Sequence, residues 1–332
     1  YGEPFIVSAA GTTNVYYWSI DAAGNVEALH HGYVNIDKTA PTTTGTTLTP
    51  APSVGWNDGD VVVTLQGADT GGAGVQKMQY ATHGSGAWTD ADASGQFTVP
   101  GPADHSNDGA HVYDYRAVDN AGNLSATTSV TVDMDTTAPV TLAQAADLRA
   151  LDGGTWHAGP LTVALTPSDP LAPDGTSSGT SGGQAATRYS TDGGATWQTG
   201  SSVVFPRWRR GGGTGTVTLL YASTDAAGNA ATPQSATVRI DNAAPTSSDD
   251  APAVSQAGPV TVHLLVTDPD SGPATVWYSL DGGDWVEAVY PGLPGVPVAV
   301  AGAGAHTLRY YAVDAAGNAQ IGYRFCQVTI GG

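Results

Sequence analysis

One short pattern occurs four times in this chain, and its spacing limits the folds that are open to it. An aromatic, strand-like segment runs into Asp-x-Ala-Gly-Asn each time. The four motif aspartates are Asp21, Asp119, Asp225 and Asp314, at separations of 98, 106 and 89 residues. Solenoid and propeller repeats are shorter, whereas about 100 residues is the size of one small β-sandwich domain. The chain is therefore predicted to be a series of small domains of one kind.

A second pattern, Asp-x-x-Ala-Pro, follows the first at a constant distance. Its aspartates, Asp37, Asp135 and Asp241, each lie 16 residues after a motif aspartate. The variable length of the repeat lies elsewhere, between the second pattern and the next copy of the first. A constant piece inside a variable repeat indicates a rigid hairpin, and Gly followed by Asn suits the positive φ of a hairpin turn.

Each repeat also contains short segments with the composition of β-strands. The segments 61–69, 160–169 and 259–268 are rich in Val, Leu and Thr, and each ends at an acidic residue. Sustained helical periodicity is absent from the sequence. About seven short strands per repeat, with a turn about every 8–12 residues, predict an all-β chain of tandem immunoglobulin-like β-sandwiches.

The two patterns also predict the domain boundaries. Complete domains are expected at 38–135, 136–241 and 242–332, and residues 1–37 have room for only the last strands of a further domain. Three strands alone do not close a sandwich core, so this segment is expected to continue a longer array or to pair with something else. The strands expected within it are 4–9, 14–21 and 32–37.

Charge and cysteine content exclude several classes of partner and site. The chain has 30 acidic and 11 basic residues, a net charge of −19, which disfavours nucleic acid and anionic membrane surfaces as partners. Its single cysteine, Cys326, has no intrachain partner and lies in a strand-like run, so a buried thiol is expected. A His-Glu-x-x-His motif and a cysteine cluster are both missing. We therefore predict that the chain is not an enzyme.

Three motifs together resemble those of bacterial immunoglobulin-like repeats in secreted and cell-surface proteins. They are Tyr-Ser-Leu-Asp-Gly-Gly before a Trp at 278–285, Tyr-x-x-Asp-x-Ala-Gly-Asn, and Asp-Thr-Thr-Ala-Pro at 135–139. The resemblance implies an extracellular or cell-surface location and no membrane insertion. It also implies a stalk, spacer or adhesin segment whose partners are other copies or neighbouring domains of a longer chain.

Two other functions stay open at this point. One is a glycan-binding module, or an accessory module of a secreted enzyme, that contacts a glycan or host surface. The segment Arg-Trp-Arg-Arg-Gly-Gly-Gly at 207–213 favours this function, because guanidinium and indole groups together suit an anionic ligand. A solvated loop would have the same composition. The other is a subunit of a surface filament, in which a neighbouring chain completes residues 1–37 by strand addition. The candidate ligand-binding residues are Arg207, Trp208, Arg209 and Arg210.

The acidic residues predict calcium sites at the ends of the domains. In an immunoglobulin-like sandwich the B–C loop, the F–G turn and the start of strand A lie at the same end. Carboxylates gathered there would repel one another, and Ca²⁺ takes 6–8 oxygen ligands in flexible geometry. The alternative is that each motif aspartate only caps its own turn. The expected ligand sets are Asp37, Asp69, Asp119 and Asn123; Asp135, Asp169, Asp225 and Asn229; and Asp241, Asp268, Asp270, Asp314 and Asn318.

Overall fold

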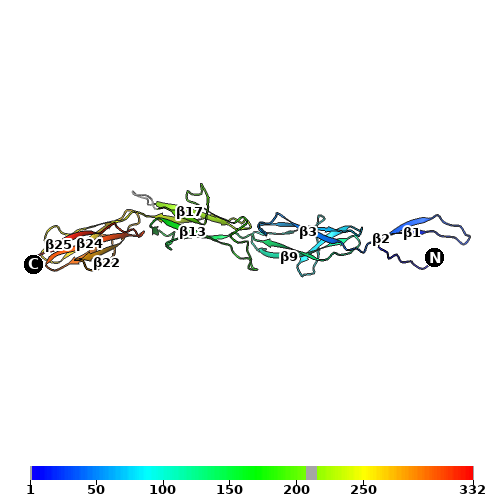
Figure 1. Ribbon diagram of the computed structural model, residues 1–332, viewed down its shortest axis with the longest axis horizontal. Coiled ribbons are helices and arrows are strands. Elements are labelled where there is room, and N and C mark those ends of the chain that lie inside the picture. The colour runs from blue at the N-terminus through cyan, green and yellow to red at the C-terminus, as the bar shows by residue number, and fades with distance from the viewer. Residues whose placement is uncertain (1, 207–214, 332) are drawn as a thin grey trace. The chain divides into compact units, whose positions relative to one another are not determined.

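A computed structural model describes residues 2–206 and 215–331 of the chain (Figure 1). These residues form strands and connecting loops without a helix, and none of them builds a segment able to cross a membrane as a helix. The contacts divide the chain into two units. One comprises Tyr1–Pro139, Ser168–Ala185 and Thr224–Ala230, and the other comprises Val140–Pro167, Ala186–Ser223 and Ala231–Gly332.

The first unit begins with an antiparallel hairpin of β1 (Gly11–Tyr17) and β2 (His30–Ile36), in which Gly11 pairs with Ile36 and Tyr17 pairs with His30. Residues 2–10 contain no strand, so the strand expected at 4–9 is wrong. The reason is that a strand at this place has no earlier strand to pair with. In the three sandwiches the equivalent strand bonds to a long strand that precedes it, and residues 1–37 contain no such strand.

The first unit continues with a sandwich of two sheets, which we call the first sandwich (Figure 1). One sheet has the order β3-β5-β8 and the other β4-β10-β9-β6-β7. Val61, Val63 and Leu65 alternate along β5 and point into the core, where they meet Tyr115 and Met134 from the facing sheet. The strands are β3 (Thr42–Thr49), β4 (Trp56–Asn57), β5 (Val61–Ala68), β6 (Val75–Thr82), β7 (Thr89–Asp90), β8 (Gln96–Val99), β9 (Gly109–Asp119) and β10 (Thr128–Met134).

The second sandwich repeats this plan with sheets β11-β13-β16 and β12-β18-β17-β14-β15. Its core lies in the second unit, whereas its loops 168–185 and 224–230 belong to the first unit. Its strands are β11 (Val140–Ala145), β12 (Trp156–His157), β13 (Leu161–Ser168), β14 (Ala186–Ser190), β15 (Gln198–Thr199), β16 (Ser202–Phe205), β17 (Gly215–Thr224) and β18 (Gln234–Ile240).

The third sandwich has sheets β19-β20-β23 and β22-β21-β24-β25. Cys326 is half-buried against its core, and burial together with Asp249 raises the pKa of the thiol to about 12. Its strands are β19 (Thr246–Asp249), β20 (Val260–Thr267), β21 (Pro273–Leu280), β22 (Val286–Val289), β23 (Val296–Val300), β24 (Gly304–Asp314) and β25 (Arg324–Ile330). The expectation of an all-β chain with tandem immunoglobulin-like sandwiches is confirmed.

The hairpin that carries the repeated motif has the same register in the N-terminal hairpin and in the first two sandwiches. Tyr17 pairs with His30, as Tyr115 pairs with Thr128 and Tyr221 with Gln234. Tyr115 and Tyr221 are core residues, but the side chain of Tyr17 is 57% exposed. The N-terminal hairpin therefore has the inward face of a sandwich sheet without a facing sheet among the described residues.

Candidate metal centre

Each Asp-x-Ala-Gly-Asn motif forms a tight turn that is capped by its own aspartate. Asp119 ends β9, and its Oδ1 accepts hydrogen bonds from the backbone N–H groups of Ala121 (2.9 Å) and Asn123 (2.8 Å). The backbone N–H of Asp119 donates to the carbonyl oxygen of Asn123 (3.1 Å). Gly122 has a φ of 91°, in the left-handed region that favours glycine. Turn capping is thus one role of the motif.

The motif asparagine ties this turn to the linker that enters the sandwich. Asn123 Nδ2 donates to Asp119 Oδ2 (2.8 Å) and to the backbone carbonyl oxygen of Asp37 (3.2 Å). Both bonds recur from Asn229 to Asp225 and Asp135 (2.8 and 2.7 Å), and from Asn318 to Asp314 and Asp241 (2.9 and 3.0 Å). The asparagine therefore holds the linker acid beside the motif acid.

Three acidic residues come together at each of three motif turns. One comes from the Asp-x-x-Ala-Pro linker, one from the loop after β5, β13 or β20, and one from the motif itself. One carboxylate oxygen of each residue lies within 4.8 Å of the corresponding oxygens of the other two. The first and second clusters lie within the first unit, and the third within the second unit. We call them the first site (Asp37, Asp69, Asp119), the second site (Asp135, Asp169, Asp225) and the third site (Asp241, Asp268, Asp314).

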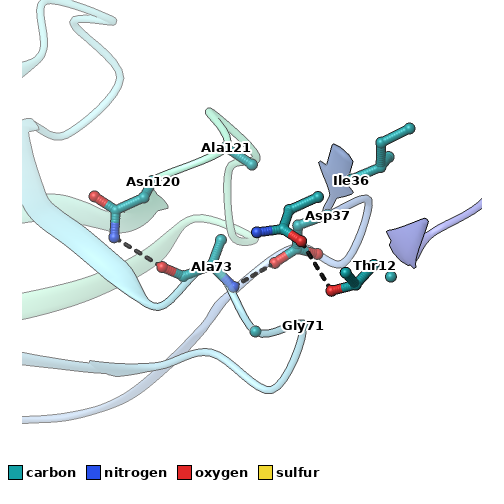
Figure 2. A pocket seen from close by; sticks show the side chains of 10 residues that line it. Thr12, Ile36, Asp37, Gly71, Ala73, Asn120 and Ala121 are labelled. Carbon is teal, nitrogen blue, oxygen red and sulfur yellow. Dashed lines mark hydrogen bonds between the residues drawn. The ribbon is translucent and has the colours of Figure 1, made fainter. Parts of the chain in front are cut away.

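The loop acid of the first site shows how the backbone fixes these carboxylates. Asp69 follows β5, and its two oxygens accept hydrogen bonds from the N–H groups of Gly71 (2.9 Å) and Gly74 (2.7 Å). The loop then passes so close to Asp37 that a Cβ atom on Gly71 would lie 2.3 Å from Asp37 Oδ1. Figure 2 shows this approach, with the N–H of Ala73 donating to Asp37. A side chain at position 71 would therefore have to displace the Asp37 carboxylate.

Burial and like charge act on the second and third sites. Burial raises the pKa of Asp169, and the neighbouring carboxylates of Asp135 and Asp225 raise it further. Burial likewise raises the pKa of Asp225 and Asp314, against the hydrogen bonds from their motif asparagines, which lower it. These carboxylates are thus held together at an electrostatic disadvantage.

The first site is electrostatically different. Burial acts to raise the pKa of Asp119, but the hydrogen bonds that the carboxylate accepts from Asn123 and Ala121 outweigh it. The pKa of Asp119 is therefore lowered.

A hard divalent cation fits these donor sets. Three carboxylates in close reach are the oxygen ligands that Ca²⁺ prefers. Asp169 Oδ1 in the second site and Asp268 Oδ2 in the third are buried and accept no hydrogen bond. A buried charged acceptor without a donor is unfavourable, and a cation would give it a partner.

Some of the residues expected at these sites have other positions. The backbone N–H of Asp270 donates to Asp268 Oδ1, and the Asp270 carboxylate is not among the three of the third site. The asparagines join the sites through their amide nitrogens. The candidate ligand-binding residues Arg207, Trp208, Arg209 and Arg210 lie outside the described residues, so the glycan interpretation stays a prediction.

Two residues that contact the motif turns were not expected from the sequence. Ser53, in the loop after β3, donates through Oγ to the carbonyl oxygen of Ala226 (2.7 Å). Arg149, in the loop after β11, donates to the carbonyl oxygens of Ala315 (2.9 Å) and Ala316 (3.1 Å). Neither residue belongs to a repeated motif, so the sequence gives no signal for these contacts.

Comparison with known proteins finds no matching family model and no matching curated protein. Solved structures with similar folds include fibronectin(III)-like modules of CbhA from Clostridium thermocellum, at 12% identity and a TM-score of 0.36, over 57% of this chain and 94% of that one. Another is a tetra-tandem repeat in the extending region of a large adhesion protein, at 17% identity and a TM-score of 0.30, over 96% and 81%. A third is a Ca²⁺-stabilized adhesin of an Antarctic bacterium that binds ice, at 21% identity and a TM-score of 0.29, over 96% and 82%.

Proposed function

We propose that the chain is a non-enzymatic, calcium-binding array of immunoglobulin-like domains, serving as a spacer or stalk segment of an extracellular or cell-surface adhesin-like protein. Its domains would be 38–135, 136–241 and 242–332, with 1–37 as part of a further domain. The observation that carries the proposal is the recurrence of one three-carboxylate cluster at the same place in three sandwiches. Extracellular modules commonly bind Ca²⁺ with a Kd of ~10⁻⁴–10⁻³ M.

The bound ion would join three parts of the chain that are separate in sequence. In the first site these are the linker through Asp37, the loop after β5 through Asp69, and the turn after β9 through Asp119. Without the ion, like charges push these parts away from one another. With it, the linker is held to the sandwich that it enters, which limits the hinge between domains. A spacer needs this stiffness.

Thermal unfolding tests the proposal. A ligand that binds only the folded state stabilises it by RT ln(1 + [L]/Kd), so about 10 mM calcium at a Kd of ~10⁻⁴ M contributes ~2.7 kcal/mol per site. We expect the unfolding midpoint in calcium to exceed that in chelator by roughly 10–20 °C for a domain of about 100 residues. Asp119→Ala should remove the response of the first sandwich alone. Equal midpoints in calcium and chelator, with no heat of calcium binding, would refute the proposal.

Assembly through the N-terminal hairpin is a second candidate function, and one observation favours it. Tyr17 and Val34 are 57% and 38% exposed, whereas the equivalent Tyr115 and Val132 are core residues of the first sandwich. A facing sheet from a neighbouring chain or domain would cover this surface. Mass measurement with limited proteolysis tests the idea: a strict monomer that is cleaved within residues 1–37 would count against it.

A further inference from the structure

The three acidic sites differ in how their carboxylate oxygens are satisfied. In the first site both oxygens of each aspartate accept a hydrogen bond from the protein. Asp37 accepts from the N–H groups of Thr39 (2.8 Å) and Ala73 (2.9 Å). Both oxygens of Asp69 accept from loop N–H groups, and both oxygens of Asp119 from its own turn. This site needs no ion to give each oxygen a partner.

The second and third sites each leave one oxygen without a partner. Asp169 and Asp268 occupy the position of Asp69, directly after the second long strand of their sandwich. One oxygen of Asp169 accepts from the N–H of Gly179 (2.7 Å), but Oδ1 is buried and accepts nothing. Asp268 Oδ1 accepts from the N–H of Gly272 (2.9 Å), and its Oδ2 is buried without a donor. In both sites a bound cation is the partner that the fold itself does not supply.

The motif turns of the second and third sites are also covered by a loop of the preceding sandwich. At the second site, Ser53 of the first sandwich donates to the carbonyl oxygen of Ala226, and Ala226 and Ala227 are buried. At the third site, Arg149 of the second sandwich donates to the turn carbonyls of Ala315 and Ala316. These contacts lie within the first unit and within the second unit, respectively. A covered turn excludes the water that would otherwise solvate the acids beside it.

The first site lacks this cover. Ala121, in the position of Ala227, is exposed. The turn lines a pocket of about 470 Å³ together with Asp37, Gly71 and residues of the N-terminal hairpin (Figure 2). Water therefore reaches the first site more freely than the other two.

We propose that the second and third sites bind calcium more tightly than the first, because each has one buried carboxylate oxygen that only the ion satisfies and a motif turn that a loop of the preceding sandwich covers. The inference rests on the proposed calcium binding. As calcium falls, the first site empties before the others, so the hinge that Asp37 enters is released first.

Calorimetric titration of the full chelator-treated chain with calcium chloride tests this order. We expect two equivalents to bind at least roughly tenfold more tightly than the third, the difference expected from relieving one buried unsatisfied acceptor. Asp169→Asn and Asp268→Asn should each remove one tight equivalent. Asp69→Asn should leave both tight equivalents and remove the weak one. Three equal sites, or the loss of a tight equivalent in Asp69→Asn, would overturn the order while leaving calcium binding in place.

A further variant tests the cover without changing a carboxylate. Ser53→Ala removes one hydrogen bond to the turn of the second site, so we expect binding there to weaken about two- to fivefold, with the other sites unchanged. An unchanged second site in this variant would remove the proposed cause. If the unaltered chain binds no calcium in the titration, the proposed function fails, and this inference fails with it.

Discussion

Replacing Asp169 by asparagine should change stability in opposite directions with and without calcium. Asp169 is one of three carboxylates of the second site, and one of its oxygens is buried without a donor. Asparagine has almost the same shape, keeps an oxygen for the N–H of Gly179, and places an N–H₂ group beside two carboxylates. It removes one negative charge and one cation ligand at once.

The magnitude follows from the spacing of the oxygens. Two charges 4.8 Å apart repel by about 1 kcal/mol at the dielectric constant of water and by about 3.5 kcal/mol at an effective value of ~20. Asp169 faces two such charges, Asp135 and Asp225. We therefore expect Asp169→Asn to stabilise the calcium-free protein by at least ~1 kcal/mol, or roughly 4–8 °C for a domain of this size. In calcium the same change should remove most of the ~2.7 kcal/mol that the ion contributes at ~100 times its Kd.

Scanning calorimetry in chelator and in calcium measures both effects on one protein. Asp92→Asn is a matched control, because Asp92 caps an exposed turn by accepting from Ser94 and Gln96 and belongs to no acidic site. That variant should lose a little stability equally in both buffers. If Asp169→Asn behaves like the control, with the same loss in chelator and in calcium, then Asp169 is a turn cap only and the electrostatic argument fails.

Two further predictions concern the pH dependence of stability and the close contact between the loop at Gly71 and Asp37. Burial raises the pKa of Asp225 and Asp314 above 3.8, so each group stabilises the fold below the ordinary aspartate pKa of 3.8 and loses that contribution as the pH rises through its higher folded-state pKa. In chelator the contribution of these two groups to the unfolding midpoint should therefore grow as the pH falls towards 3.8, and calcium should flatten this slope. Gly71→Ala should weaken the first site at least about tenfold by calcium titration, because its Cβ would meet Asp37. Gly59→Ala is the control, because Gly59 has open space and no left-handed φ, and it should leave calcium affinity within about twofold.

The fold was predictable because it depends on repeated local features. The alternation of Val61, Val63 and Leu65 and the turn residues after Asp119 act within a few positions of one another, and both give the expected strand and turn. The strand expected at 4–9 failed for the opposite reason. A strand of that kind forms only when it pairs with an earlier strand. The sequence of residues 4–9 alone does not determine whether such a partner is present.

The sequence predicted which acids come together at each site, because that follows from the topology of the sandwich, but it did not predict the contacts around them. Knowing which loops share one end of a sandwich was enough to bring Asp37, Asp69 and Asp119 together. The roles of Ser53 and Arg149 were not predictable, because they depend on how a loop of one sandwich packs on a turn of the next. The unpartnered oxygen of Asp169 depends on its own long loop, 169–185, which gives the other oxygen the N–H of Gly179. The three sites therefore differ in their contacts with residues outside the repeated motifs, and the motifs alone do not predict those contacts.

The N-terminal hairpin separates the two roles of the repeated motif. Asp21 makes the same capping bonds as its equivalents, from the N–H groups of Ala23 (2.9 Å) and Asn25 (2.8 Å) and from Asn25 Nδ2 (2.8 Å). Among the described residues Asp21 belongs to no cluster of three acids, and those hydrogen bonds lower its pKa. The turn thus forms without a linker acid or a loop acid. Turn capping explains Asp and Asn in all four copies, but it does not explain why two further acids meet the motif in the three copies that belong to complete sandwiches. The proposed cation binding would explain the presence of those acids and also the burial of like charges, which the turn alone does not require.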